Sequence, residues 1–288
     1  MKAAIDIGTN TTRMLIGEVK DGKVNVQAQF ILEPRLGEGI SEGRLTPEAM
    51  ARTLRALAEF KKVTREYQIQ EVSLAATSAV RDAVNKKEFV DAVFKETGWQ
   101  VEIIDGIEEA FLSFTGAVSV LPPDTTLPVI VDIGGGSTEV IFQSEGQVKG
   151  TSVNVGAVRL KETSWSAEEL NRRLLPALRD LMEYKEKITL VAVGGTATTA
   201  AAVLYGIKNY SRAAVQGKTL TFGEIKGLRD KLAAMTPEER KKVPGLSPKR
   251  ADIIIPGLDI LTGIMGQLGA TRVVISDAGI LDGILLTR

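Results

Sequence analysis

One pattern occurs twice in this sequence, and the second copy begins 126 residues after the first, at Asp132 instead of Asp6. Residues 6–16 (DIGTNTTRMLI) align without a gap with residues 132–142 (DIGGGSTEVIF). In both copies an apolar run precedes Asp-Ile-Gly, and a glycine-containing turn and another strand pattern follow. Chance accounts easily for a lone Asp-Ile-Gly, but poorly for eleven aligned residues with the same flanks. The repeat therefore predicts two similarly built domains, each beginning with strand, loop and strand.

Strand patterns alternate with helix patterns along the chain, which predicts an α/β protein. The predicted strands cover residues 2–7, 12–19, 24–31, 71–76, 101–104, 127–133, 137–142, 147–155, 188–193 and 273–276. The predicted helices cover residues 47–67, 86–97, 107–120, 166–186 and 248–268, and a last helix begins near residue 277. Capping boxes at Ser166, Thr221 and Thr236 mark helix starts, as does Thr46 before Pro47.

The length of the chain and one break in its pattern predict the domain boundary. The 288 residues exceed a typical single domain of roughly 100–200 residues. Pro122, Pro123 and Asp124 interrupt the pattern just before the second copy begins. We expect a first domain at residues 1–124 and a second at 125–288, with the last helix packing back on the first domain.

The sequence contains no histidine and no cysteine. This excludes disulfides, thiolate metal sites, a Ser-His-Asp triad, a phosphohistidine intermediate and imidazole–zinc sites. Catalysis has to use carboxylates, hydroxyls, Lys, Arg, backbone amides or a hard metal ion. The 36 basic and 36 acidic residues give zero formal net charge, so no overall field favours nucleic acid or an anionic membrane. A polyanionic substrate would need a local positive patch.

The first ten residues, MKAAIDIGTN, lack the basic start and apolar core of a signal peptide. No stretch approaches the about 20 uninterrupted apolar residues of a membrane span. We therefore expect a cytoplasmic protein with neither a nucleic-acid nor a membrane partner.

Both copies of the repeat carry a loop suited to phosphate. The first loop covers residues 6–11, and its Gly8 permits a tight turn. The backbone amides and the Thr and Asn side chains of this loop can donate to phosphate oxygens. Asp6 can hold hydrated Mg²⁺. In the second loop (residues 132–139), three consecutive glycines let the backbone approach one anion closely. The second loop is neither a Walker loop nor a dinucleotide fingerprint. Ordinary β-turns are the simpler alternative for each.

A third loop (residues 194–199, Gly-Gly-Thr-Ala-Thr-Thr) follows a predicted strand and opens a helix, an arrangement that can bind an anion. Residues 276–279 (Ser-Asp-Ala-Gly) form a weaker version of it. Close packing of helix on strand explains such glycines equally well.

Charged residues near the loops leave two interpretations open. Arg13 and Glu139 occupy equivalent places in the two copies. If the two halves face each other, Arg13 offers a guanidinium to phosphate and Glu139 offers a carboxylate to a metal or water. In the alternative interpretation, both side chains lie on exposed strand faces. Glu108 and Glu109 begin a predicted helix, where they either stabilise its dipole or present a carboxylate to a ligand.

Taken together, these segments resemble the superfamily of actin, the heat-shock chaperone ATPases and the sugar kinases. In more detail, the chain is similar to the exopolyphosphatase and guanosine pentaphosphate phosphatase family, along essentially its whole length. The segments that carry this finer resemblance are residues 6–10, 35–39, 76–82, 106–110, 132–139, 194–196, 248–252 and 274–279.

The resemblance implies a role for individual residues. Glu109 resembles the base that activates water, and Asp132 and Glu139 resemble carboxylates that bind or orient the metal and the attacking water. The implied phosphate contacts, together with those expected from the third loop, are Thr9, Asn10, Arg13, Arg81, Gly134, Gly135, Gly136, Ser137, Thr138, Gly195 and Thr196. The implied ligands of Mg²⁺ or Mn²⁺ are Asp6, Asp132 and Glu139. Phe111 stands where many relatives carry Arg, so one phosphate contact is missing.

The resemblance also implies the architecture and the assembly. We expect two ribonuclease H-like, actin-like domains, each a mixed five-stranded sheet with flanking helices, around an interdomain cleft. Longer relatives carry further C-terminal domains, so the chain resembles a short form. A homodimer and a part in the stringent response are expected on the same ground.

Several activities remain open from the sequence. The first is hydrolysis of the terminal phosphoanhydride of inorganic polyphosphate, with release of orthophosphate. The second is hydrolysis of guanosine pentaphosphate, which uses the same chemistry and is compatible with dual activity. A kinase of the same superfamily and a non-enzymatic ATP-binding scaffold are more distant alternatives.

Overall fold

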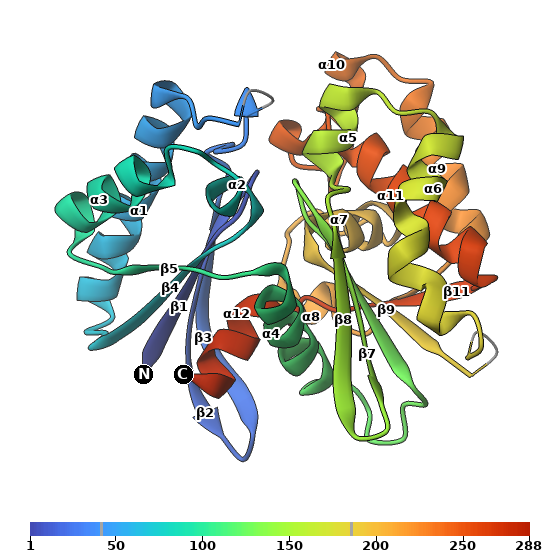
Figure 1. The fold of residues 1–288 in the computed structure, drawn as a ribbon, viewed down its shortest axis with the longest axis horizontal. Coiled ribbons are helices and arrows are strands. Elements are labelled where there is room, and N and C mark those ends of the chain that lie inside the picture. The colour runs from blue at the N-terminus through green and yellow to red at the C-terminus, as the bar shows by residue number, and fades with distance from the viewer. Residues whose placement is uncertain (41–42, 185–186) are drawn as a thin grey trace. The chain divides into compact units, whose positions relative to one another are not determined.

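The computed structural model describes residues 1–40, 43–184 and 187–288, and these form two compact units (Figure 1). Unit 1 comprises Met1–Ser119 together with Ile280–Arg288, and unit 2 comprises Val120–Gly279. The division thus falls five residues before the predicted Asp124, and the end of the chain belongs to unit 1. The last helix belongs there because Gly283 lies so close to another helix of unit 1 that an added Cβ would sit 2.0 Å from the carbonyl oxygen of Leu112.

Unit 1 contains a five-stranded mixed sheet in the order β3-β2-β1-β4-β5. Its strands are β1 (Lys2–Ile7), β2 (Thr12–Lys20), β3 (Lys23–Leu32), β4 (Glu71–Ala76) and β5 (Val101–Ile103). Its helices are α1 (Pro47–Glu66), α2 (Ser78–Arg81), α3 (Lys86–Thr97), α4 (Gly106–Val118) and α12 (Ile280–Thr287). Strand β1 pairs antiparallel with β2 and parallel with β4.

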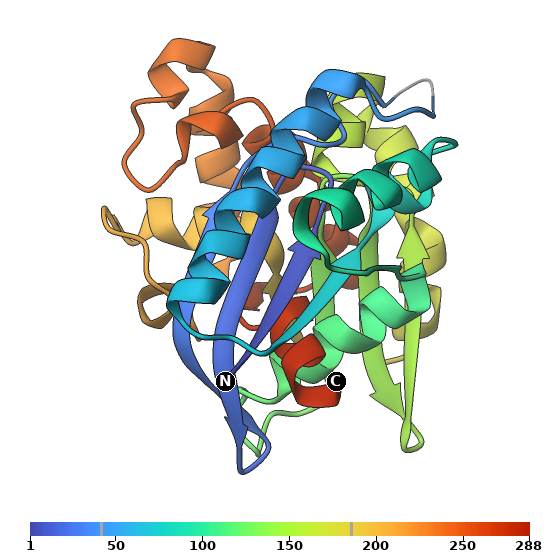
Figure 2. The same ribbon diagram turned by 90° about the vertical axis from the view of Figure 1, so that its left-hand side faces the viewer.

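Side chains alternate across this sheet and divide its core into two layers. Ile5 and Ile7 pack with residues of α1 and α3, including Phe60 and Phe89. Figure 2 shows α1 lying across that face of the blue strands. On the other face, Ala4 packs with residues of α4 and α12. Because each fully buried Ile or Phe stabilises the fold by about 1.5–3 kcal/mol, both layers contribute strongly to unit 1.

Unit 2 contains a six-stranded sheet in the order β10-β11-β9-β6-β7-β8. Its strands are β6 (Pro128–Ile133), β7 (Thr138–Ser144), β8 (Gln147–Val153), β9 (Thr189–Val193), β10 (Thr219–Thr221) and β11 (Arg272–Ile275). Its helices are α5 (Ala157–Thr163), α6 (Ala167–Leu178), α7 (Gly194–Leu204), α8 (Arg212–Val215), α9 (Phe222–Ala233), α10 (Pro237–Arg240) and α11 (Ile254–Leu268), with 3₁₀ turns at Arg179–Leu181 and Pro248–Arg250. The prediction of five strands was wrong here, because the short β10 pairs antiparallel with β11 and extends the edge.

The two units share the ribonuclease H-like, actin-like architecture that was predicted. Strand β6 pairs antiparallel with β7 and parallel with β9, as β1 pairs with β2 and β4. Adding the repeat offset of 126 to the bounds of β1 gives those of β6. The repeat in the sequence is therefore a repeat of strand pairing.

Two predicted helices differ from the structure. Helix α6 begins at the Ser166 cap but ends at Leu178, with Pro176 inside it, and the predicted end at residue 186 lies outside the described residues. Glu169 completes no capping box, because its carboxylate binds Arg172 and Arg173 instead. The predicted helix 248–268 starts only at Ile254, which puts Pro256 in the first turn, where its missing N–H does no harm. The capping boxes at Thr221 and Thr236 are both formed.

Among the described residues, no helix combines the length and the apolar character that crossing a membrane requires.

Candidate active site

The first and second loops have the same backbone geometry. The amide of Gly8 donates to the carbonyl of Thr11 over 2.9 Å, and the amide of Gly134 donates to the carbonyl of Ser137 over 3.0 Å. The strand register is equivalent as well, because Asp6 lies opposite Arg13 and Asp132 lies opposite Glu139. Each loop thus presents one carboxylate at the end of its first strand and a charged partner on the second.

A second backbone segment packs against each loop and binds its carbonyl groups. In unit 1, the amide of Gly37 donates to the Thr9 carbonyl over 2.8 Å. In unit 2, the amides of Ala157 and Val158 donate to the carbonyls of Gly134 and Gly135, both over 2.9 Å. The approach is so close that a Cβ on Gly156 would lie 2.4 Å from the Gly135 carbonyl.

The amide groups of the same loops remain available. Within the described residues, the amides of residues 9–11 and of residues 135–137 donate no hydrogen bond. Three consecutive amides with no acceptor form an anion-binding arrangement of the kind predicted from the glycines. The hydroxyl of Thr138, a predicted phosphate contact, donates to the Val155 carbonyl over 2.5 Å and thereby supports the loop.

Buried polar atoms gather around the first loop. Asp6 is 3% exposed, and its Oδ2 accepts from Nη2 of Arg13 over 2.6 Å and from Nε over 3.1 Å. In the described part of the chain, Asp6 Oδ1, Thr12 Oγ1 and both polar atoms of the Asn10 side chain are buried without a hydrogen-bond partner. Leaving such groups unsatisfied costs about 1–3 kcal/mol each, so this loop has the chemistry of a site that a ligand or a cation completes.

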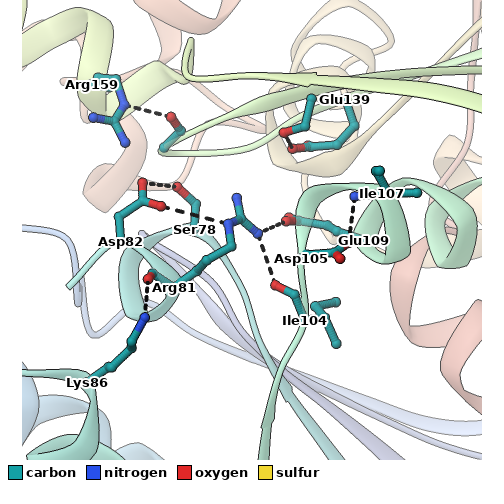
Figure 3. Close-up of polar contacts among 12 residues, drawn as sticks. Ser78, Arg81, Asp82, Lys86, Ile104, Asp105, Ile107, Glu109, Glu139 and Arg159 are labelled. Atoms are coloured by element: carbon teal, nitrogen blue, oxygen red, sulfur yellow. Dashed lines mark hydrogen bonds and ion pairs between the residues drawn. The ribbon is translucent and has the colours of Figure 1, made fainter. Parts of the chain in front are cut away.

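The predicted base lies at the start of α4, where Asp105 caps the helix by accepting from the amides of Ile107 and Glu108. Figure 3 shows Arg81 reaching Glu109, with Nη1 donating to Oε2 over 2.8 Å and to the Ile104 carbonyl over 3.2 Å. Glu109 is 9% exposed. Arg81, predicted as a phosphate contact, is therefore also the group that orients the predicted base.

The structure gives the two acids at the start of α4, Glu108 and Glu109, different partners. Glu108 accepts a hydrogen bond from Nη2 of Arg288 over 2.5 Å, at the end of the chain. Glu109 instead pairs with Arg81, which the predicted site includes. Glu108 therefore has a structural partner, whereas Glu109 keeps the position predicted for a reactive carboxylate.

Asp132 and Glu139 lie side by side, since directly opposed residues of an antiparallel pair point to the same face. Glu139 is 1% exposed, and its Oε1 accepts from the Ser152 hydroxyl over 2.7 Å. Gly194 has a φ of +86°, and a Cβ there would lie 2.9 Å from Asp132 Oδ1. The second and third loops of unit 2 therefore meet at Asp132.

The third loop begins α7, as predicted, and Arg250 covers it. A Cβ on Gly195 would lie 1.6 Å from Nη1 of Arg250, so the guanidinium would have to shift to admit a larger residue. Thr196 packs against Gly257 of α11, where an added Cβ would lie 2.3 Å from the Thr196 hydroxyl oxygen. The third loop thus combines a helix N-terminus with the guanidinium of Arg250. On its other side, the close contact between Thr196 and Gly257 is explained by helix packing.

Three residues at these loops were missed by the sequence analysis. Nε of Arg159 donates to the Gly136 carbonyl over 2.8 Å (Figure 3), although no pattern around Arg159 signals this. Arg250 lies in segment 248–252, which was noted only for its resemblance. The hydroxyl of Tyr210 donates to Oδ1 of Asp277 over 2.5 Å, and burial of that hydroxyl and the neighbouring carboxylate raise the pKa of Tyr210.

The described residues contain no group of three or more Asp and Glu side chains that could hold a metal ion. Of the predicted ligands, Asp132 and Glu139 are neighbours in unit 2, and Asp6 belongs to unit 1. Mg²⁺ is commonly held by one or two carboxylates with water and phosphate oxygens completing its shell, so the Asp132–Glu139 pair and the unpartnered Asp6 Oδ1 both fit such an ion.

The comparison with known protein families decides the classification. Residues 15–288 match the model of the Ppx/GppA phosphatase family. The chain belongs to this family. It is 33% identical to Exopolyphosphatase 2 of Mycobacterium tuberculosis, over 99% of this chain and 97% of that protein.

Two further relatives are longer. The chain is 33% identical to the Bifunctional 3-dehydroquinate synthase/phosphatase of Fusobacterium nucleatum over 99% of its own length, but it spans only 46% of that protein. It is 28% identical to the Guanosine-5'-triphosphate,3'-diphosphate pyrophosphatase of Vibrio campbellii over 98% of its own length and 58% of that protein.

The crystal structure of an exopolyphosphatase-like protein superposes with a TM-score of 0.91 at 32% identity, covering 99% of this chain and 97% of that one.

Proposed function

We propose that this phosphatase hydrolyses the terminal phosphoanhydride bond of inorganic polyphosphate and releases orthophosphate. The observation that carries the proposal is the pair of equivalent loops, each with three consecutive amides that bind no carbonyl of the described residues. Phosphoryl transfer depends mainly on positioning and on offsetting negative charge, and such loops provide both. The match to Exopolyphosphatase 2 along nearly its whole length supports this substrate class.

The proposed roles follow the contacts of each side chain. The amides of residues 9–11 and 135–137 hold phosphoryl oxygens, and Arg81 offsets part of their charge. Glu109, oriented by Arg81, accepts the proton of the attacking water as general base. The oxygen of that water forms the new bond to the terminal phosphorus, and the shortened polyphosphate leaves with the electrons of the broken P–O bond.

A divalent metal ion, Mg²⁺ or Mn²⁺, is part of the proposal. Asp132 and Glu139 would hold it in unit 2, and Asp6 offers an unpartnered oxygen in unit 1. Bound there, the ion would offset negative charge on the phosphate oxygens. The Ser152 hydroxyl holds Glu139 in place for this role.

Hydrolysis of guanosine pentaphosphate is the second candidate, favoured by the similarity to the Vibrio campbellii pyrophosphatase. Both activities would use the same loops and the same base. A homodimer, a cytoplasmic location and a part in the stringent response stay predictions from the sequence.

A side-by-side assay tests the proposal. Purified protein with Mg²⁺ receives polyphosphate, guanosine pentaphosphate or ATP at equal concentrations of terminal phosphate, and orthophosphate release is measured. We expect the highest kcat/KM with polyphosphate and little release from ATP. Preference for guanosine pentaphosphate would establish the second candidate, and transfer of phosphate to an organic acceptor in place of water would refute both.

A further inference from the structure

A pocket of about 880 Å³ lies on unit 2, and no residue of the three loops lines it. Residues of α5, α6, α9, α10 and α11 line it, all helices that Figure 1 labels on that unit. Asp259 and Thr262 lie one turn apart on α11 and both reach the pocket, so one face of this helix is open to it. The volume lies within the about 300–1,000 Å³ of typical small-molecule sites.

Aromatic side chains form part of the lining. Trp165 and Phe222 both line the pocket, and both pack against the main hydrophobic core of unit 2. The guanidinium of Arg173 lies 4.1 Å from the centre of the Trp165 ring. These contacts hold the indole in place, and a rigid aromatic ring is a suitable surface for a planar ligand.

Most charges of the lining are already balanced. Nε of Arg229 donates to Asp259 over 2.7 Å, and its Nη1 lies 3.3 Å from Asp230. Lys161 pairs with Asp252 over 2.6 Å. Together these five groups carry one net negative charge, because Arg229 contacts two carboxylates.

Two cations of the lining have no carboxylate partner among the residues that the structure describes. Within the described residues, Lys226 and Arg240 form no ion pair. Nη1 of Arg240 donates to the Ala251 carbonyl over 3.1 Å, and in this part of the chain its Nε is buried without a hydrogen-bond acceptor. A buried donor with no acceptor is satisfied when a ligand supplies one, and a guanidinium with a lysine beside the same pocket suits a phosphate group.

We propose that this pocket binds a nucleoside phosphate at a site separate from the phosphate loops. The planar base would lie against Trp165 and Phe222, and the phosphate would contact Lys226 and Arg240. Both kinds of contact are needed, because the aromatic surface alone offers no preference for an anion and the two cations alone offer none for a ring. Free phosphates and free nucleosides should therefore bind less tightly.

Tryptophan fluorescence provides a direct test, because the chain has two tryptophans and only Trp165 lines the pocket. In Trp99→Phe protein, with EDTA present to suppress hydrolysis, ADP should quench the Trp165 signal saturably. Tripolyphosphate and adenosine should each need at least about tenfold higher concentration, because each makes only one kind of contact. An absence of saturable quenching at millimolar ADP would overturn the proposal.

The variant Lys226→Ala/Arg240→Ala should raise the Kd for ADP more than about tenfold, since both charge-assisted contacts to the phosphate are lost. The control Lys231→Ala changes an exposed lysine of α9 outside the lining and should leave the Kd unchanged. Equal Kd values in the double variant and the control would refute the site. Both variants should release orthophosphate within about twofold of wild type, so failure of polyphosphate hydrolysis in wild-type protein would refute only the proposed function.

Discussion

Replacing Gly156 with Ala should impair catalysis by displacing the second loop while leaving the fold intact. The new Cβ would lie 2.4 Å from the Gly135 carbonyl carbon and oxygen and 2.5 Å from the Gly136 amide nitrogen. All three are backbone atoms, so no side chain can rotate away. Gly156 has a φ of −140°, which Ala adopts freely, and the effect therefore comes from this contact alone.

The size of the effect follows from the distance. Ordinary contact begins near 3.4 Å, so the loop or the segment opposite has to move by about 1 Å. A misplacement of this size costs about 10²-fold in rate when it affects groups that position the substrate. Overpacking of this kind should also lower the free energy of unfolding by about 1–3 kcal/mol.

Steady-state orthophosphate release from polyphosphate measures the first quantity, and urea unfolding measures the second. Gly227→Ala is the matched control: it lies inside α9 with nothing within 4 Å of its added Cβ, so activity should not change. A Gly156→Ala protein with kcat/KM within threefold of wild type would show that the second loop does not position the phosphate.

Glu109→Gln should lower kcat by about 10²–10⁴-fold with little change in substrate affinity, because the general base is lost; Glu108→Gln is the control, and a larger loss in that variant would reverse the assignment of the two acids. Activity should require Mg²⁺ or Mn²⁺, and full activity in excess EDTA would contradict this requirement. Asp132→Asn should raise the metal concentration needed for the half-maximal rate, whereas a change in the maximal rate alone would indicate that Asp132 orients water. Tyr210 has a raised pKa in the folded protein, so the stability that its protonated hydroxyl contributes is present below the ordinary pKa of about 10 and is lost as the pH rises above it. Wild type should therefore lose more unfolding free energy than Tyr210→Phe between pH 9 and pH 11, and parallel pH profiles would show that the pKa of Tyr210 is not raised in the folded protein.

Local patterns determined most of the secondary structure. The predicted strands 2–7 and 71–76 and the predicted helix 86–97 match β1, β4 and α3 residue for residue. Such segments are set by side-chain periodicity and caps, which a sequence displays directly. The helix predicted at 248–268 failed at its start, because the turn before Ile254 depends on contacts with α10 and not on a local cap: Nη1 of Arg240 binds the Ala251 carbonyl there.

The candidate site could be predicted only in part. Alignment of the two copies was enough to place Arg13 and Glu139 at equivalent positions. That Asp6 faces Arg13 and Asp132 faces Glu139 was not predicted, because the strand register depends on the geometry of each turn. Arg81 of α2 and Glu109 of α4 lie 28 residues apart in the sequence, and no periodicity predicts the contact between them. Arg159 and Arg250 were missed for the same reason. Arg159 reaches the second loop from α5, and Arg250 reaches the third loop from the 3₁₀ turn at Pro248–Arg250.

The sequence by itself determined that the chain has two strand-loop-strand copies, that their chemistry uses oxygen ligands, arginines and amides, and which residues head each loop. Those properties are local, because they depend on residue type and on the spacing of near neighbours. Only the tertiary structure decided which carbonyls of the loops accept hydrogen bonds. It also decided which amides of the loops donate none within the described residues and so remain for a ligand. It also decided that Glu109 pairs with Arg81 while Glu108 pairs with Arg288. Adjacent residues on a helix point in different directions, so their partners depend on how distant segments pack around them.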